Sequence, residues 1–383
     1  MNRFDKNINH VLVLQGGGAL GSYQAGAFQA MATEGYRPDY VAGISIGAIN
    51  AALIAGNRPE DRLERLRTFW NLVSRGEALG NTWIDMIAPV LPRGHENDLR
   101  AAQAMFAGVQ GFYTPRQPSP FLQKPGTVEA LSFYSTEPLR DTLLELVDFD
   151  YLNSGEVRFA VGAVDVATGN QVYFDNTRQQ IGPEHVMASG ALPPGFPPVE
   201  IDGALYWDGG IVSNTPLQYV LDNHDRHQDM TVFQFDLFSA HGKLPETITD
   251  IETREKEIRF SSRTRFSTDQ TAMLLEAREA LQRLYDKLPK NLQKSDEVRV
   301  LMEAAHPGRM LLVQMIYERP DYEKSSRDYE FSRRSMQDHW DKGAADAQKT
   351  LRHARWIEKQ ADKSPLTVID CNKLKDSPGK ATA

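Results

Sequence analysis

The chain has 383 residues, of which 41% are hydrophobic and 25% are charged, and its formal net charge at pH 7 is −8. This length allows one large domain or two ordinary ones with a buried core, and the acidic balance argues against a nucleic-acid-binding protein, which needs a basic surface. The single cysteine, Cys371, excludes an internal disulfide framework and a multi-cysteine zinc site.

The start of the chain alternates between strand and helix patterns. Residues 10–14 form a short apolar run that predicts a buried strand of a parallel sheet, and apolar residues recur at helical spacing from Leu20 to Met31. Residues 40–44 predict a second strand, and the alanine-rich run 46–55 predicts a helix packed inside the protein. Alternating strands and helices predict an α/β protein with a layered sheet.

Residues 80–127 lose this regular pattern, although they are apolar and rich in proline. A segment of this kind is either an insertion packed on the core or a lid over a functional site. The sequence leaves both interpretations open.

Further strands are predicted after this segment. Residues 157–166 and 171–174 predict one hairpin, and residues 199–207 predict a second one around a central Asp-Gly pair. Residues 231–238 form another apolar run that predicts a strand.

The composition changes after about residue 245, where charged helical patterns begin. We therefore expect a first domain over residues 10–240 and a mainly helical C-terminal extension over 245–360, with one strand at 310–317 and a long helix at 330–358. Residues 361–383 are polar and predict a disordered tail.

A candidate nucleophile follows the second predicted strand. The run Gly43-Ile-Ser45-Ile-Gly47 matches the nucleophile elbow Gly-x-Ser-x-Gly and lies between a predicted strand and a predicted helix, as that turn requires. Gly43 and Gly47 leave room for the tight turn, and the serine then stands at a helix N-terminus, where developing negative charge is favoured. The alternative is a purely structural turn.

A glycine-rich run follows the first predicted strand and has two interpretations. Gly16, Gly17, Gly18 and Gly21 fit the dinucleotide-binding fingerprint, with Asp39 as the ribose-binding acid. However, Asp39 precedes the second strand instead of ending it. We therefore favour an oxyanion hole, in which backbone amides of the run donate to a tetrahedral intermediate.

A nucleophilic serine needs a base, and its usual partner is histidine. The chain has nine histidines, and His185 and His306 resemble ordinary polar or capping residues. Asp208-Gly209-Gly210 offers a different base, because the glycines let the chain turn away and leave the carboxylate facing a site. A free aspartate, with a pKa near ~3.9, is a poor base at neutral pH, so we expect burial to raise the pKa of Asp208.

Together these motifs resemble those of the patatin-like phospholipase family. The runs 16–21, 43–47 and 208–210 occur in that family's order and context, and residues 188–198 resemble its segment upstream of the aspartate. The resemblance covers roughly residues 10–240. The chain after this region resembles the helical extension of a bacterial patatin-like subgroup.

The resemblance implies a patatin-like three-layer sandwich with a mostly parallel central sheet flanked by helices, and a catalytic domain at 10–240. It also implies a Ser45–Asp208 dyad, an oxyanion hole from the amides of Gly16 to Gly18, and hydrolysis of lipid-like acyl esters. Leu20 stands where the family usually has Arg or Lys. Losing this cation weakens the case for head-group recognition, so simple ester hydrolysis is better supported than phospholipase activity.

No cofactor, metal or nucleic acid is expected, since the scheme does not need calcium and no Asp-rich calcium loop is visible. The N-terminus lacks an export signal and no segment has the ~20 apolar residues of a membrane span, so we expect a cytoplasmic protein, with peripheral membrane contact also compatible. Two other functions stay open: a non-catalytic lipid-binding or regulatory protein with this fold, and, with less support, an NAD-binding oxidoreductase.

Overall fold

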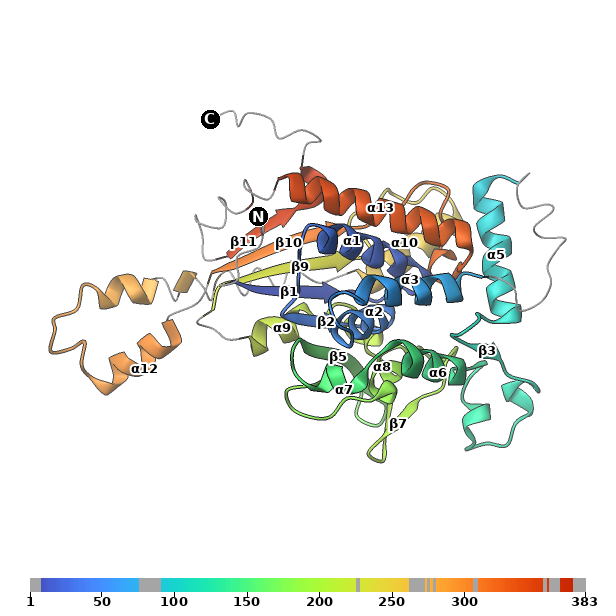
Figure 1. Cartoon of the computed structure of the whole chain (residues 1–383), viewed down its shortest axis with the longest axis horizontal. Coiled ribbons are helices and arrows are strands. Elements are labelled where there is room, and N and C mark those ends of the chain that lie inside the picture. Colours follow the sequence, from blue (N-terminus) through green and yellow to red (C-terminus); the bar gives the residue numbers. More distant parts are fainter. Residues whose placement is uncertain are drawn as a thin grey trace.

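The computed structural model describes residues 8–75, 91–224, 228–261, 280–305, 309–353 and 366–374, with 273, 276, 277 and 357. Over these residues a nine-stranded sheet has the order β11-β10-β9-β1-β2-β5-β8-β7, and β6 pairs with β5 (Figure 1). The parallel strands are β1 (Asn9–Leu14), β2 (Tyr40–Gly43), β5 (Arg158–Asp165), β9 (Met230–Asp236), β10 (Met310–Ile316) and β11 (Leu366–Asp370). The antiparallel strands are β6 (Gln171–Asp175), β7 (Val199–Ile201) and β8 (Ala204–Asp208).

Helices cover both faces of the sheet, and further helices lie in the connections between its strands. They are α1 (Gly21–Thr33), α2 (Ile46–Ala55), α3 (Arg62–Val73), α5 (Arg93–Ala107), α6 (Glu137–Leu146), α7 (Phe149–Asn153), α8 (Pro183–Ser189), α9 (Leu217–Asn223), α10 (Ile248–Phe260), α12 (Asp296–Ala305) and α13 (Arg333–Arg352). A two-stranded ribbon, β3 (Thr114–Pro115) with β4 (Tyr134–Ser135), lies outside the main sheet. No helix in the described part of the chain combines the length and apolar character needed to cross a bilayer.

Strand β1 shows why its sequence is apolar at each position from Val11 to Leu14. Leu12 and Leu14 join the larger core, which includes residues of α1, α2, α3 and α13, whereas Val11 and Val13 join a second core with residues of α9. A strand in the middle of a parallel sheet is buried on both faces and therefore carries no polar alternation. The predicted α/β class, with helices flanking a mostly parallel central sheet in three layers, is confirmed.

Helix α13 packs directly against α1, the helix that follows the glycine-rich run (Figure 1). A Cβ on Gly26 would collide with the carbonyl oxygen of Trp340, and a Cβ on Gly343 would collide with that of Tyr23. The indole nitrogen of Trp340 also donates to Gln29 Oε1 at 3.0 Å. The C-terminal region is therefore joined to the helix that supports the site.

The two predicted hairpins are confirmed as β5–β6 and β7–β8. The predicted disordered tail is wrong for Leu366–Asp370, because these residues form β11, which pairs in parallel with β10 and buries Ile369. The sequence signal was weak, since five residues between polar segments are a short pattern. Strands β10 and β11 also place part of the expected C-terminal extension in the central sheet.

Of the predicted insertion at 80–127, residues 80–90 lie outside the described residues, as do 361–365 and 375–383 of the predicted tail. The described part of the insertion contains α5 and the start of the β3–β4 ribbon, beside the carboxyl ends of the parallel strands (Figure 1). It therefore has regular structure of its own.

Candidate active site

Ser45 occupies a strained turn between β2 and α2. Its backbone has φ 56° and ψ −124°, and a positive φ is costly for a residue with a side chain. A Cβ on Gly43 would collide with the carbonyl oxygen of Gly47, and a Cβ on Gly47 would collide with that of Leu14. Only glycine fits at both flanking positions, which is the physical reason for the Gly-x-Ser-x-Gly pattern.

The turn is held from the side by Ser189, at the end of α8. The Ser45 amide donates to the carbonyl oxygen and to the hydroxyl of Ser189, both at 3.1 Å. The Ser189 hydroxyl in turn donates to the Gly162 carbonyl on β5 at 2.6 Å. Nothing in the local sequence around Ser45 indicates this partner, which lies 144 positions away.

Asp208 lies at the end of β8, next to the Ser45 side chain. It is 2% exposed. Its Oδ1 accepts from the Gly210 amide at 2.7 Å, and its own amide donates to the Ala191 carbonyl at 3.0 Å. Burial raises the pKa of Asp208 to about 7, while hydrogen bonds from the Ser45 side chain and the Gly210 amide act in the opposite direction. The direction agrees with the sequence-based expectation for a buried carboxyl group.

The two glycines after Asp208 have different roles. A Cβ on Gly209 would lie 2.6 Å from the Gly162 carbonyl oxygen, so the chain must pass close to β5 there. A Cβ on Gly210 would lie 2.8 Å from Asn214 Oδ1 and 3.0 Å from the Asp208 carboxylate. Both positions therefore need glycine for close packing around the carboxylate.

The glycine-rich run lies beside Ser45 and is held by Asn214. The Gly16 amide donates to the Asn214 carbonyl at 3.2 Å, and Asn214 Nδ2 donates back to the Gly16 carbonyl at 3.0 Å. The expected oxyanion donor at Gly16 is therefore already engaged, which corrects that part of the expectation. The amides of Gly17 and Gly18 form no hydrogen bond with any residue that the structure describes.

Gln15, immediately before these glycines, connects the run to distant parts of the chain. Its fully buried side chain accepts from the Leu237 and Phe238 amides at 2.6 and 2.9 Å and donates to Thr215 Oγ1 at 2.9 Å. Together with Asn214, it was missed by sequence reasoning. The only sequence signal at Gln15 is a polar residue at the end of an apolar strand, and this does not identify a partner. Asn214 lies in the loop before α9 and lacks even this signal.

Leu20 and Gly21 point away from the site. Leu20 is fully buried in the larger core. A Cβ on Gly21 would lie 2.6 Å from Ile46 Cγ1 and 2.9 Å from Trp70, so this glycine lets α1 approach α2 and α3. The side chain at the position of the expected cation is therefore part of the core in this protein.

Ser45 and Asp208 open into a mainly apolar cavity of about 380 Å³. The cavity is lined by Gly16, Gly17, Gly18, Ser45, Ile46, Ile49, Met105, Phe112, Tyr113, Tyr134, Gly190, Leu192, Pro193, Pro194, Gly195, Phe196, Asp208, Gly210, Asn214, Phe238, Phe260, Asp328, Tyr329 and Phe331. Several of these aromatic rings contact one another, including Tyr113 with Tyr134 at 4.8 Å and with Phe196 at 5.2 Å between centroids. The cavity suits an apolar ligand that presents one polar bond to Ser45.

No histidine lines this cavity in the part of the chain that the structure describes. His185 is the third residue of α8, where its Nδ1 accepts from the Gly182 amide at 2.9 Å, and burial lowers its pKa. His306 lies outside the described residues. Asp39 lies just before β2, where its carboxylate accepts from the His10 amide at 2.8 Å. It is therefore at the amino ends of the parallel strands β1 and β2, whereas the glycine-rich run is at the carboxyl end of β1. This position does not fit a ribose-binding acid.

Comparison with known proteins gave two family matches in this chain. A family model described as patatin-like phospholipase matches residues 12–221, and a second, described as patatin phospholipase, matches residues 258–363. No curated protein matched the chain.

Solved structures gave distant matches. VipD from Legionella pneumophila is 14% identical, with 93% of this chain and 77% of that chain covered and a TM-score of 0.36. Full-length ExoU from the type III secretion system of Pseudomonas aeruginosa, solved in complex with SpcU, is 13% identical, with 94% and 80% covered and a TM-score of 0.26.

Proposed function

Because the chain belongs to the patatin-like phospholipase family, we propose that it is a serine acyl-ester hydrolase in which Ser45 is the nucleophile and Asp208 the general base. One observation carries the proposal: the Ser45 side chain and the buried Asp208 carboxyl group lie together at the wall of an apolar cavity, where Ser45 acts to lower the pKa that burial raises. A hydroxyl that points at a carboxylate with a raised pKa can lose its proton as it attacks.

The proposed reaction follows from this contact. Ser45 Oγ attacks the ester carbonyl carbon while its proton passes to Asp208, and the tetrahedral intermediate then expels the alcohol, which takes that proton back. Water, deprotonated by the same carboxylate, attacks the acyl-enzyme, and the proton then passes from Asp208 to Ser45 Oγ as the acyl–oxygen bond breaks, which releases the acid and restores Ser45. A base with a pKa of about 7 suits both directions of proton transfer at neutral pH.

We assign the oxyanion-stabilising role to the amides of Gly17 and Gly18. Both residues line the cavity beside Ser45, and neither amide has a hydrogen-bond partner among the described residues. Gly18 has φ 55°, so it adopts a backbone conformation that favours glycine. Unengaged amides next to a nucleophile supply stabilisation that is realised as charge develops in the transition state.

The lining supports a lipid-like ester as the substrate. Aromatic and aliphatic side chains dominate the cavity wall, and Met105, Phe112, Tyr113 and Tyr134 come from α5 and the segment after it. The insertion therefore forms one wall of the site, and we assign it the role of a cover. An acyl chain is the part of such a substrate that gains most from an apolar wall.

The same segment also presents apolar side chains to solvent. Phe106 is 83% exposed, Phe121 85% and Leu122 77%. Phe133, also exposed, contacts Phe121 with ring centroids 5.9 Å apart and precedes Tyr134 of the cavity wall. Exposed apolar groups next to an apolar cavity favour a peripheral contact with a lipid surface, from which the substrate would enter.

The test is activity-based labelling combined with hydrolysis of esters of graded chain length. The wild-type protein should react with a fluorophosphonate probe and hydrolyse at least one ester, whereas Ser45→Ala should lose labelling and at least ~10³-fold of kcat/KM. Circular dichroism would establish that the variant is folded. A folded wild-type protein with no labelling and no hydrolysis at any chain length would contradict the proposal and favour a non-catalytic lipid-binding protein.

A further inference from the structure

A second cavity, of about 420 Å³, lies between the end of α3, helix α5 and the N-terminal end of α13. Phe331 lines both this cavity and the one that contains Ser45, so the two are neighbours. Their linings differ in charge. Among the described residues, the lining of the second cavity includes four arginines, Arg75, Arg100, Arg333 and Arg334, and one carboxylate, Glu96.

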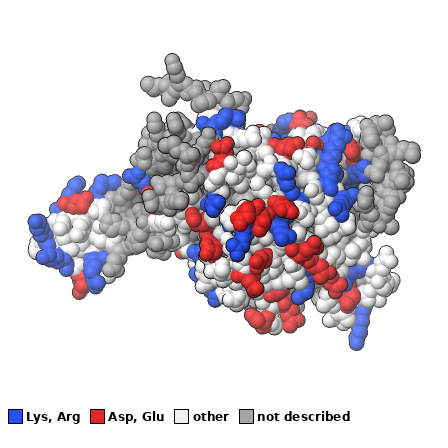
Figure 2. All heavy atoms as spheres, viewed as in Figure 1, with Lys and Arg blue, Asp and Glu red and all other residues white. Residues whose placement is uncertain are grey.

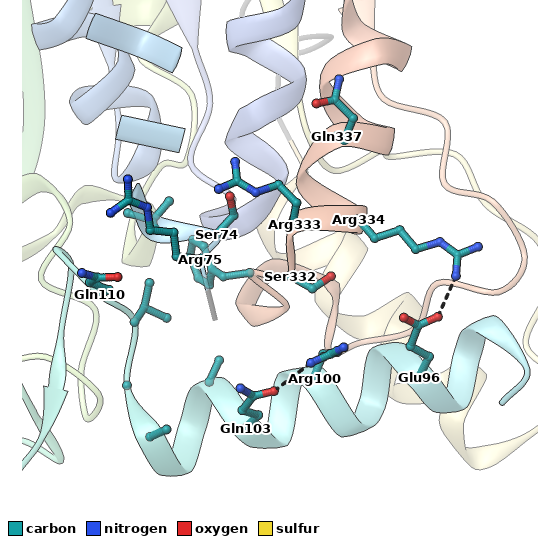
Figure 3. Close-up of a pocket in the computed structure, with 16 residues that line it drawn as sticks. Ser74, Arg75, Glu96, Arg100, Gln103, Gln110, Ser332, Arg333, Arg334 and Gln337 are labelled. Carbon is teal, nitrogen blue, oxygen red and sulfur yellow. Dashed lines mark hydrogen bonds and ion pairs between the residues drawn. The ribbon is translucent and has the colours of Figure 1, made fainter. Parts of the chain in front are cut away.

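Glu96 is already engaged with one of these arginines. It is 6% exposed, and its Oε2 accepts from Arg334 at 3.0 Å. Figure 3 shows Arg334 turned away from the other arginines toward Glu96, whereas Arg75 and Arg333 lie together on one side and Arg100 on α5 faces them. Arg75 and Arg333 therefore lie at the cavity, and among the described lining residues no further carboxylate is left to pair with them.

The contacts of Arg75 and Arg333 do not supply the missing negative charge. Arg333 hydrogen-bonds the side-chain amide oxygen of Asn71 and donates to its carbonyl at 2.8 Å, and both acceptors are neutral. The Arg75 side chain forms no hydrogen bond or ion pair with any residue in the described part of the chain. Burial and the nearby charge of Arg75 both lower the pKa of Arg333, which is the direction expected for like charges held together.

Two further features suit an anion. The first turn of α13, including Arg333 and Arg334, lines the cavity, and the first amides of a helix have no acceptor within the helix. The chain as a whole carries a net charge of −8, so this group of arginines is a local exception. In Figure 2, one of several groups of Lys and Arg lies at the upper right of the view, near where Figure 1 places α5 and this end of α13.

We propose that this arginine cavity, formed by Arg75, Arg100 and Arg333 with the first turn of α13, binds a phosphate group. Guanidinium groups match phosphate oxygens with paired hydrogen bonds, and several cations around one cavity favour an anion with more than one negative charge. Either a soluble phosphate compound or the phosphate of a lipid head group has this chemistry. A nucleic acid does not fit, because its backbone needs an extended basic surface.

The first experiment measures binding of inorganic pyrophosphate to the full chain by calorimetry. Wild type should bind it, and Arg75→Gln should bind about tenfold more weakly, because it removes a cation without removing any hydrogen bond to another described residue. Arg75→Gln combined with Arg333→Gln should weaken binding further. The matched control is Arg140→Gln, on the exposed face of α6, which should bind as wild type does.

The second experiment distinguishes the two sources of phosphate. Ser45→Ala protein is sedimented with phosphatidylcholine vesicles, with and without phosphatidic acid, and compared with the same protein carrying Arg75→Gln. A gain on phosphatidic acid that Arg75→Gln removes would assign a lipid head group, whereas pyrophosphate binding without this gain would assign a soluble ligand. Both outcomes support the proposal.

The proposal is overturned if wild type does not bind pyrophosphate, or if Arg75→Gln and Arg140→Gln bind it as wild type does. It does not depend on hydrolysis, because Ser45→Ala should keep full pyrophosphate affinity. Failure of the hydrolase proposal and failure of the arginine cavity would therefore give different results.

Discussion

The Ser45 cavity and the arginine cavity share Phe331 but are built on different physical principles. In the first, one carboxyl group is removed from water by an apolar wall, and its pKa rises to about 7. In the second, several cations are placed around a partly open hollow with one carboxylate between them. The main electrostatic effect in the Ser45 cavity is desolvation of a carboxyl group, whereas in the arginine cavity it is an excess of positive charge.

This difference determines how each cavity should respond to change. A site based on desolvation depends on packing and on the protonation of one group, whereas arginines keep their charge throughout the working pH range. Substitutions and pH should therefore separate the two sites. Asp208→Asn and acidification should separate the two cavities, whereas Gly18→Ala tests the packing around the Ser45 cavity alone.

Asp208→Asn should abolish most hydrolysis while leaving pyrophosphate binding unchanged. The amide cannot accept the Ser45 proton, so kcat/KM should fall by about 10²–10⁴-fold. The same substitution should stabilise the fold. The raised folded pKa means that the native state holds more protons than the unfolded state between pH ~4 and ~7, so stability falls as pH rises through this window.

Since Asn does not ionise, Asp208→Asn should gain roughly 2–4 kcal/mol in free energy of unfolding at pH 8 and much less at pH 4. Urea denaturation of both proteins at the two pH values measures this gain. Equal free energies of unfolding for wild type and Asp208→Asn at pH 8 would show that ionised Asp208 does not destabilise the fold. Loss of pyrophosphate binding would show that the cavities are not separate.

Acidification should separate the cavities without any substitution. Below a pKa of about 7, kcat/KM should fall tenfold for each pH unit as Asp208 becomes protonated, and it should level off above that pH. Chromatography of the released acid across pH 5 to 9 (about the range in which the fold should persist) gives this profile. A flat profile down to pH 5 would remove Asp208 as the base.

Gly18→Ala should have the smallest of these effects. Its φ is 55°, and a Cβ would collide with the Asp328 carbonyl, so we expect a loss of about 2–3 kcal/mol in free energy of unfolding. Gly155→Ala is the matched control, because Gly155 has φ 81° but no atom within 4 Å of the added Cβ, and it should lose only about 1 kcal/mol. Thermal unfolding compares the two. Equal losses would mean that backbone conformation alone, rather than the contact with Asp328, requires glycine at position 18.

Sequence patterns identified those parts of the candidate site that depend on neighbouring residues. Ser45 and Asp208 are each marked by adjacent glycines, which the close approach of Gly47 to Leu14 and of Gly209 to Gly162 requires. A steric requirement between neighbouring residues produces a short sequence motif, so it can be predicted from the sequence. The α/β class was predictable for the same reason, since a strand buried on both faces is apolar throughout.

The residues that sequence reasoning missed act across long separations. Gln15 reaches Thr215, 200 positions away, and Asn214 reaches Gly16, 198 positions away. A single polar residue carries no information about which distant amide or carbonyl it will meet. The same limit applies to the arginine cavity, because Arg75, Arg100 and Arg333 come from three separate helical regions.

The place of β9 in the sheet has a consequence for any attempt to prepare a shortened chain. The patatin-like match ends at residue 221, but Met230–Asp236 lies directly beside β1, and β10 and β11 follow beyond it. A protein cut at that match would expose one whole side of β1 as an unpaired edge, ready to join the strands of other molecules. Such a fragment should precipitate on expression, although it retains Ser45, Asp208 and all of the glycine motifs.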